Sequence, residues 1–255
     1  MTGRLEGKIA LITGVGGGMG VAAARRFAAE GAKVAGCDLD RDGAARTEEL
    51  VRGEGGEITV SGGVDLGDPD AARAWVDAAV ATYGGIDVLY NNASTQRFGA
   101  LDELSIEDWD FTMRNELDLV YYTVRAAWPH LKAYGGGSII NVGSIAALRG
   151  VEFMPQNAHS SAKGGVIALT RTLAAEGAPD GIRANTISPG FVKSPATDKF
   201  VGDELRAFQM GMHLIRRPGL GEDIAPLAVY LASDESVWVT GQNYSIDGGV
   251  TAGFR

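Results

Sequence analysis

The residues whose types and spacing could do chemistry begin with a glycine cluster near the start of the chain. Residues 13–20 read TGVGGGMG; they follow the apolar run Ile9–Ile12 and precede the helical pattern Val21–Glu30. Glycines at such a junction let the backbone turn tightly and approach a diphosphate closely. The free amides and the positive dipole end of the following helix favour the anion. The GxxxGxG spacing therefore predicts a dinucleotide-binding turn.

A carboxylate after the second apolar run indicates which dinucleotide is bound. Asp38 lies 24 residues after Gly14, at the end of that run. A carboxylate at this point accepts hydrogen bonds from the adenosine ribose hydroxyls and repels a 2′-phosphate. Gly17 brings no positive charge to the turn, and Arg41 comes directly after an aspartate. The sequence therefore favours NAD over NADP.

These groups need a sheet whose strands alternate with helices. Asp68-Pro69 predicts the start of a helix, because an N-cap residue precedes a proline at the first helical position. Ser105–Asp108 predicts a second start, because it resembles a capping box. The alternation predicts an α/β fold, a Rossmann-type doubly wound parallel sheet. No repeat or composition break divides residues 1–255, so we expect a single domain. The predicted strands are Ile9–Thr13, Lys33–Cys37, Ile58–Ser61, Ile86–Tyr90, Ser138–Val142, Arg183–Ile187 and Asn243–Ile246.

Composition and net charge limit the classes of partner that the protein is expected to bind. The net charge of −9 argues against binding to nucleic acid or to an anionic membrane. No apolar run approaches the roughly 18 residues of a membrane span. The one cysteine, Cys37, excludes an internal disulfide, fits a reducing compartment such as the cytoplasm, and is interpreted as a packing residue. Nothing in the sequence resembles a metal site.

Further motifs make the chain resemble a short-chain dehydrogenase/reductase over essentially its whole length. Residues 13–20 are similar to the family's TGxxxGxG turn, and residues 91–94, NNAS, to its NNAG with serine for glycine. Residues 189–194 resemble the segment that holds the nicotinamide carboxamide, and residues 241–249 the closing strand and turn. The residues expected at the cofactor, from the turn and from the resemblance, are Gly14, Gly17, Gly18, Met19, Gly20, Asp38, Leu39, Asp65, Leu66, Asn92, Ala93, Lys163, Pro189, Gly190, Val192 and Ser194.

The resemblance also implies a catalytic group, with one departure. Ser144 follows the fifth predicted strand, where the family has its catalytic serine, and Asn115 falls at the family's helix asparagine. The family's YxxxK pair corresponds to His159 and Lys163, so lysine is kept and tyrosine has become histidine. In the family, tyrosine exchanges a proton with the substrate oxygen, serine holds that oxygen, lysine binds the ribose, and asparagine supports a proton relay.

A histidine can act as acid or base because its ring titrates near neutral pH. His159 and Lys163, at positions i and i+4, share one helix face. The imidazole is shorter than phenol, and the charges of Lys163 and of an oxidised nicotinamide disfavour imidazolium. Neutral imidazole can still accept a proton, so alcohol oxidation should be less impaired than ketone reduction.

Three interpretations follow for position 159. His159 replaces tyrosine in a working NAD(H)-dependent oxidoreductase that interconverts a secondary alcohol and a ketone. Alternatively, it is a deliberate or incidental change in an oxidoreductase whose parent had tyrosine. In the third interpretation hydride transfer is lost, and the chain is a cofactor-binding protein or a lyase or dehydratase. The sequence favours the first two together over the third.

The substrate itself cannot be identified, although the segments that would line its pocket can. Residues 94–99, 145–156 and 191–215 should form the lining, and Phe98, Phe153, Met154 and Phe191 suggest an apolar, ring-sized pocket. The resemblance further implies a homotetramer, built partly from the helices Ser105–Lys132 and Asn157–Glu176. His130 and His213 lack partners at ligand spacing and are interpreted as structural.

Overall fold

The centre of the molecule is a sheet of seven parallel strands in the order β3-β2-β1-β4-β5-β6-β7. The computed structural model describes residues 3–152, 154–194 and 202–253 of the chain. The predicted single-domain α/β fold is confirmed, and each predicted strand is present with ends that differ by at most two residues. The strands are β1 Ile9–Thr13, β2 Lys33–Asp38, β3 Glu57–Gly62, β4 Val88–Asn91, β5 Gly137–Val142, β6 Ile182–Pro189 and β7 Asn243–Ile246.

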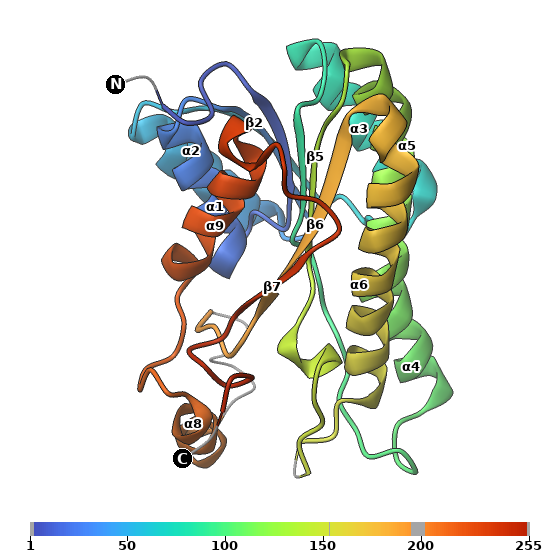
Figure 1. The fold of residues 1–255 in the computed structure, drawn as a ribbon, viewed down its shortest axis with the longest axis vertical. Coiled ribbons are helices and arrows are strands. Elements are labelled where there is room, and N and C mark those ends of the chain that lie inside the picture. Colours follow the sequence, from blue (N-terminus) through green and yellow to red (C-terminus); the bar gives the residue numbers. More distant parts are fainter. Residues whose placement is uncertain (1–2, 153, 195–201, 254–255) are drawn as a thin grey trace.

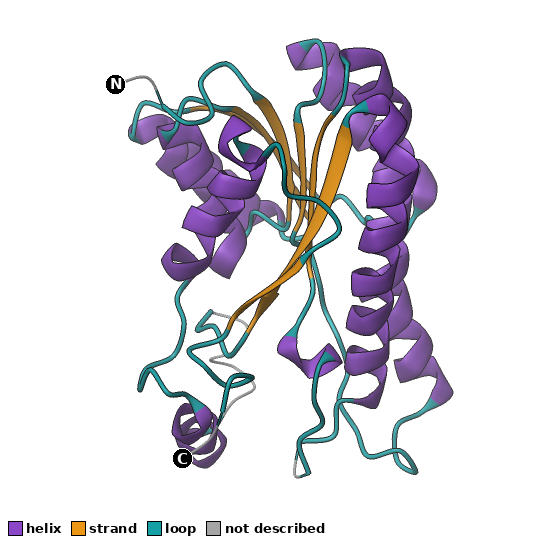
Figure 2. Cartoon of the chain, in the orientation of Figure 1, coloured by secondary structure: helices purple, strands orange, loops and turns teal. Residues whose placement is uncertain are grey.

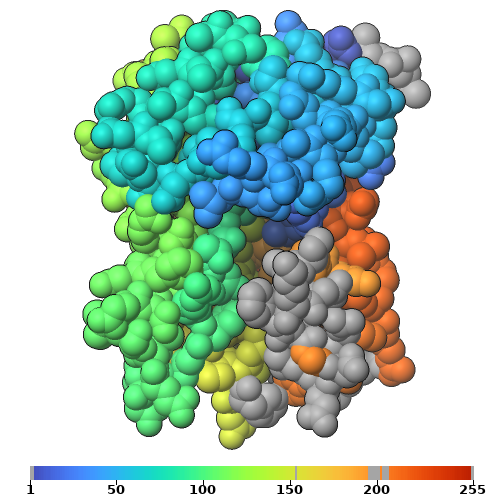
Figure 3. Space-filling model, turned by 180° about the vertical axis from the view of Figure 1, so that it is seen from behind, coloured from blue at the N-terminus to red at the C-terminus, as the bar shows by residue number. Residues whose placement is uncertain are grey.

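Helices cover both faces of this sheet and give a three-layer molecule (Figures 1 and 2). On one face lie α1 Gly18–Ala29, α2 Arg41–Gly53 and α9 Gly221–Ala232. On the other lie α3 Pro69–Tyr83, α4 Ile106–Met113, α5 Leu119–Tyr134 and α6 Asn157–Gly177. A further helix, α8 Asp203–Met212, lies beyond the carboxyl ends of the strands. Figure 3 shows the far face, with the N-terminal part of the chain in blue and cyan across its upper half.

The strands are apolar because helices cover both faces of the sheet. Every residue of β1 is buried. Ala10 and Ile12 pack into the core beneath α1 and α9, whereas Ile9 and Leu11 pack into the core beneath α3 and α5. Because successive side chains of a strand point to opposite faces, a strand buried on both sides needs apolar residues at nearly every position.

Both predicted helix starts are formed. The Asp68 side chain accepts from the Asp70 amide and Pro69 is the first residue of α3. The Ser105 side chain accepts from the Asp108 amide at 3.0 Å. The expected helix Ser105–Lys132 is not one regular helix, however. The π-helical turn Arg114–Asp118 separates α4 from α5. Such wide turns occur frequently at functional sites.

The strand order also fixes where a ligand can bind. Strand β1 lies between β2 and β4, so the chain leaves β1 toward one edge of the sheet and later returns to build the other. Ligands of open parallel sheets bind at the carboxyl ends of the strands, beside this change of direction. No helix in the described ranges combines the length and apolar character needed to cross a membrane.

We expect Leu89→Ala to lower the free energy of unfolding by about 2–5 kcal/mol, because truncation of a core leucine leaves a cavity. Leu89 in β4 is 0% exposed. Leu101→Ala is the matched control: Leu101 is 86% exposed, and its loss should change stability by less than about 0.5 kcal/mol. Urea denaturation measures both, and equal effects would contradict the core assignment.

Candidate functional site

The glycine turn after β1 is packed so closely that side chains are excluded at two of its positions. Gly14 has a φ of +74°, and a Cβ there would lie 2.8 Å from the Cα of Ala93. A Cβ on Gly20 would collide with the carbonyl oxygen of Gly14. At Gly17, by contrast, a Cβ would meet nothing within 4 Å. The turn therefore combines a tightly packed base with open space at the N-terminus of α1, as a diphosphate requires.

Asp38 is held beside this turn by backbone amides. Its Oδ2 atom accepts from the Gly16 amide at 2.7 Å, and its Oδ1 atom accepts from the Asp40 amide at 2.8 Å. The carboxylate thus lies at the carboxyl end of β2, next to the turn, where a ribose would follow the diphosphate. The adjacent Leu39 is exposed. Arg41, the nearest cation in sequence, lies against Gly62 and Gly63 at the end of β3.

The NNAS segment after β4 is joined to the glycine turn. The amides of Asn92 and Ala93 donate to Thr13 Oγ1 at 2.9 and 3.0 Å. The Asn92 side-chain amide donates to the carbonyls of Thr13 and Gly14, each at 3.1 Å. Its Oδ1 atom is buried and accepts no hydrogen bond from the described residues. That orphan acceptor is the kind of group that a bound cofactor could satisfy, so the site fits a dinucleotide.

Two predicted cofactor residues after β3 have protein partners. Asp65 accepts from Arg114 Nη2 at 2.8 Å and from the Gly67 amide at 3.0 Å. The hydrogen bond from Arg114 lowers the pKa of the Asp65 carboxyl below its ordinary value. Leu66 is buried in the core. The ion pair ties the end of β3 to the π-helical turn, which carries Arg114.

The segment after β6 returns to the glycine turn. Pro189 ends the strand, and the Gly190 amide donates to the Ile246 carbonyl at 2.9 Å. Val192 pairs with Gly219 in an isolated parallel bridge. A Cβ on Gly18 would lie 3.0 Å from the Ser194 Cβ, so Ser194 lies against the start of α1. Residues 195–201, the continuation of this predicted lining segment, lie outside the described residues.

The side chains expected to do acid–base chemistry meet beyond the end of β5. Ser144 accepts from the Ala146 amide at 3.1 Å, and its Oγ atom is 3.3 Å from His159 Nε2. Lys163, one turn along α6, donates to the Val142 carbonyl at 3.0 Å. Burial lowers the pKa of the Lys163 ammonium, and the nearby Glu116 carboxylate partly offsets that shift. The structure thus brings Ser144, His159 and Lys163 together.

The sequence reasoning missed Glu116. This carboxylate is 0% exposed and lies on the π-helical turn. Its Oε2 atom is 2.7 Å from His159 Nδ1, its Oε1 atom accepts from Ser94 Oγ at 2.8 Å, and Lys163 Nζ is 3.9 Å from Oε1. One signal was present in the sequence: Glu116 is four residues from both Thr112 and Val120, which are buried. A charge on a buried helix stripe requires a partner.

Asn115 lies beside this group but points elsewhere. Its side-chain amide donates to the Phe111 carbonyl at 2.8 Å, and its backbone carbonyl accepts from the Thr95 amide at 3.4 Å. The amide therefore helps to close the wide turn that carries Glu116. The polar partners that the structure gives Lys163 are Val142 and Glu116.

An aromatic residue lies against His159. The Phe98 ring contacts the imidazole edge to face, with 5.9 Å between centroids and 74° between planes. The Asn157 side chain donates to the Gly99 carbonyl at 3.0 Å, which ties this loop to α6. Of the other predicted lining residues, Met154 contacts Gln209 through its sulfur at 3.5 Å, whereas Phe153 lies outside the described residues.

The remaining histidines have local partners. His130 Nε2 is 2.9 Å from an Asp77 carboxylate oxygen, and the buried His213 bonds through Nδ1 to the Gln209 carbonyl at 2.6 Å. Cys37 is fully buried in the core, as its interpretation as a packing residue requires. Within the described ranges, no cluster of His, Cys, Asp or Glu could hold a metal ion.

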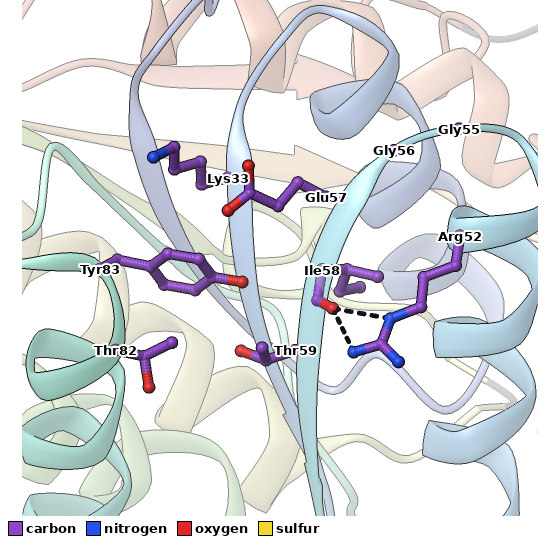
Figure 4. A pocket seen from close by; sticks show the side chains of 9 residues that line it. All are labelled: Lys33, Arg52, Gly55, Gly56, Glu57, Ile58, Thr59, Thr82 and Tyr83. Carbon is purple, nitrogen blue, oxygen red and sulfur yellow. Dashed lines mark hydrogen bonds between the residues drawn. The ribbon is translucent and has the colours of Figure 1, made fainter.

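A separate hollow lies at the opposite end of the strands (Figure 4). It opens where β2 and β3 begin, and Arg52 there donates from Nε and Nη2 to the Ile58 carbonyl at 3.2 and 3.1 Å. It contains none of the predicted site residues. Its lining residues are Lys33, Arg52, Gly55, Gly56, Glu57, Ile58, Thr59, Thr82 and Tyr83.

Known proteins match the chain over nearly all of its length. A family model described as enoyl-(acyl carrier protein) reductase matches residues 14–251. A 3-alpha-(or 20-beta)-hydroxysteroid dehydrogenase of Mycobacterium tuberculosis is 38% identical over 99% of this chain and 93% of its own length. A cyclohexanol dehydrogenase of Acinetobacter sp. is 33% identical, over 99% and 98%. A crystal structure described as a short-chain dehydrogenase/reductase from Burkholderia xenovorans has a TM-score of 0.93 and 33% identity, over 99% and 100%.

We expect Gly20→Ala to weaken dinucleotide binding at least tenfold and to lower stability, because its methyl group would push Gly14 out of the turn. NADH fluorescence titration and urea denaturation measure the two effects. The control is Gly53→Ala, at the end of α2, where a Cβ meets nothing within 4 Å. That change should leave NADH affinity unaltered and stability within about 1 kcal/mol. Unchanged binding in Gly20→Ala would refute the role given to the turn.

Proposed function

Because the chain belongs to the short-chain dehydrogenase/reductase family, we propose that it is an NAD(H)-dependent oxidoreductase that interconverts a secondary alcohol and a ketone. The whole chain, residues 1–255, would act as one cofactor-binding domain. The observation that carries the proposal is the position of His159 between a serine hydroxyl and a buried carboxylate, at the carboxyl end of the strands that hold the glycine turn. A bound nicotinamide would supply the hydride acceptor or donor.

Each residue of the group has a separate task in this proposal. Ser144 orients the substrate oxygen through its hydroxyl. His159 takes the hydroxyl proton through Nε2 during oxidation and returns it during reduction. It does so in place of the tyrosine that the short-chain dehydrogenase/reductase family has at this position. Lys163 would bind the nicotinamide ribose, and Asn115 would support the proton path by shaping the turn next to it. General acid–base catalysis of this kind typically contributes a factor of about 10² to 10⁴ in rate.

The choice of NAD over NADP rests on the charge beside the glycine turn. Asp38 presents a carboxylate where the ribose of the adenosine would lie, and a 2′-phosphate would bring a second negative charge against it. Arg41 lies against Gly62 and Gly63. The residues proposed to contact the cofactor are those predicted from the sequence, with Asp65 engaged by Arg114 at the adenine end.

The substrate class is proposed from two observations. The relatives named above are a 3-alpha-(or 20-beta)-hydroxysteroid dehydrogenase and a cyclohexanol dehydrogenase, and cyclohexanol and the 3-alpha-hydroxysteroids carry the hydroxyl on a ring. Phe98, half-exposed and in edge-to-face contact with His159, offers an apolar surface beside the proposed proton acceptor. We therefore expect a cyclic secondary alcohol. We also expect a homotetramer in the cytoplasm without nucleic-acid or membrane partners, on the family resemblance, the lone buried cysteine and the negative net charge.

The direct test incubates the protein with NAD⁺ and a panel of cyclic and acyclic secondary alcohols. Turnover is measured as the increase in NADH absorbance. We expect NADH to accumulate with cyclic alcohols, and Ser144→Ala to lower kcat by about 10² or more. A chain that binds NADH but never consumes or produces it with any alcohol or ketone would be a binding protein. Conversion of substrate without change in cofactor absorbance would identify a lyase or dehydratase instead.

Cofactor choice has its own test in Asp38→Asn. We expect this change to weaken NADH binding by about tenfold or more, because a charged acceptor is lost, and to weaken NADPH binding less or not at all. Asp42→Asn, in the first turn of α2, removes the same charge from an exposed position and should leave both affinities unchanged. Equal losses for the two cofactors in Asp38→Asn would contradict the assignment.

A further inference from the structure

We propose that Glu116 is a positioning residue, which together with Ser94 locks the His159 ring in the one orientation and tautomer that can accept the substrate proton. The proposal rests on the function proposed above and names the group that makes histidine suitable at this position. Its basis is a continuous set of hydrogen bonds in which every donor and acceptor can be assigned.

The direction of these hydrogen bonds follows from the chemistry of a carboxylate. An ionised carboxylate only accepts hydrogen bonds. Glu116 Oε1 is occupied by the Ser94 hydroxyl at 2.8 Å, so Oε2, 2.7 Å from His159 Nδ1, requires a hydrogen on Nδ1. In a neutral ring that places the free lone pair on Nε2. The carboxylate therefore selects the tautomer whose basic nitrogen points away from it.

The far side of the ring agrees with this assignment. Ser144 Oγ accepts from the Ala146 amide at 3.1 Å, which leaves its own hydrogen free to point at Nε2, 3.3 Å away. A substrate hydroxyl that displaced or joined Ser144 would meet the same lone pair. In alcohol oxidation the hydroxyl proton would pass to Nε2, and the ring would become imidazolium and release that proton before the next turnover. A bound oxidised nicotinamide would supply the acceptor for the hydride.

Glu116 also supplies the charge that this step needs. The groups that face it are His159 and Lys163 from α6 and the Ser94 hydroxyl from the loop after β4. The carboxylate is 0% exposed, so water screens it little. The formation of imidazolium close to a buried ammonium is unfavourable unless an anion lies near both, and Glu116 is 2.7 Å from one and 3.9 Å from the other.

Two departures from the family's pattern thus belong to one hydrogen-bonded group. Ser94 replaces the glycine of NNAG and His159 replaces the tyrosine, and Glu116 connects the two side chains. A buried carboxylate that loses its imidazole partner is costly. We therefore expect His159→Tyr alone to have a lower free energy of unfolding and a lower kcat than the wild-type chain. Adding Glu116→Leu to His159→Tyr should restore part of the lost stability.

The test uses ¹⁵N-labelled histidine, because the chain has three histidines and His159→Gln assigns the signal of interest. We expect the wild-type His159 ring to show the pattern of a hydrogen on Nδ1. Glu116→Gln has one side-chain oxygen for two donors, so it should mix the tautomers. The same variant should lower kcat by about tenfold to a hundredfold, while KM and NADH affinity change by less than about twofold. Ser94→Ala should act in the same direction, with a few-fold loss.

The control is Glu107→Gln, an exposed glutamate of α4, which should alter neither spectrum nor rate. A wild-type ring with its hydrogen on Nε2, or an unchanged kcat and tautomer in Glu116→Gln, would overturn the inference. Should Glu116→Gln fail to fold, the wild-type spectrum and Ser94→Ala still decide it. If no alcohol or ketone is turned over, the proposed function fails, yet the tautomer measurement still tests the role of Glu116 independently.

Discussion

Because all seven strands run parallel, their carboxyl ends meet along one edge of the sheet, and the residues proposed to bind the cofactor and to react lie there. The glycine turn leaves β1, Asp38 ends β2, the NNAS segment leaves β4 and Ser144 follows β5. These segments are far apart in sequence, yet hydrogen bonds join them directly: Thr13 holds the amides of residues 92 and 93. The site therefore depends on the register of neighbouring strands more than on any single loop.

The buried carboxylate changes the electrostatic balance that the sequence alone indicates. With only Lys163 and an oxidised nicotinamide in view, a charged imidazole is opposed by two cations. Glu116 reverses that expectation, because it places an anion within hydrogen-bonding distance of the ring. Lys163 and His159, on one face of α6, then share one carboxylate. His159 thus has a hydrogen-bonding partner on each side of its ring, Glu116 at Nδ1 and Ser144 at Nε2.

The sheet and the glycine turn could be predicted from the sequence because both are local patterns. An apolar run of four to eight residues followed by glycines and a helical pattern carries its own evidence, and strand ends were correct to within two residues. Glu116 could not be placed in the same way. A period of 3.6 residues puts it on the buried stripe, but its partner is 43 residues later in the chain. The π-helical turn left no signal, and the role of Phe98 beside His159 required the folded loop.

The wide turn between α4 and α5 has a consequence for how this chain can vary. Each residue of a regular helix rotates the following side chains by about 100° about the axis. A π-helical turn closes its hydrogen bonds five residues apart instead of four, so it takes up one extra residue while the faces of α4 and α5 stay in register. Loss of one residue from Arg114–Asp118 would therefore restore regular geometry with little rotation of either helix. The packing of α4 and α5 thus tolerates loss of this one residue better than the site does, because the positions of Arg114, Asn115 and Glu116 on the wide turn depend on it.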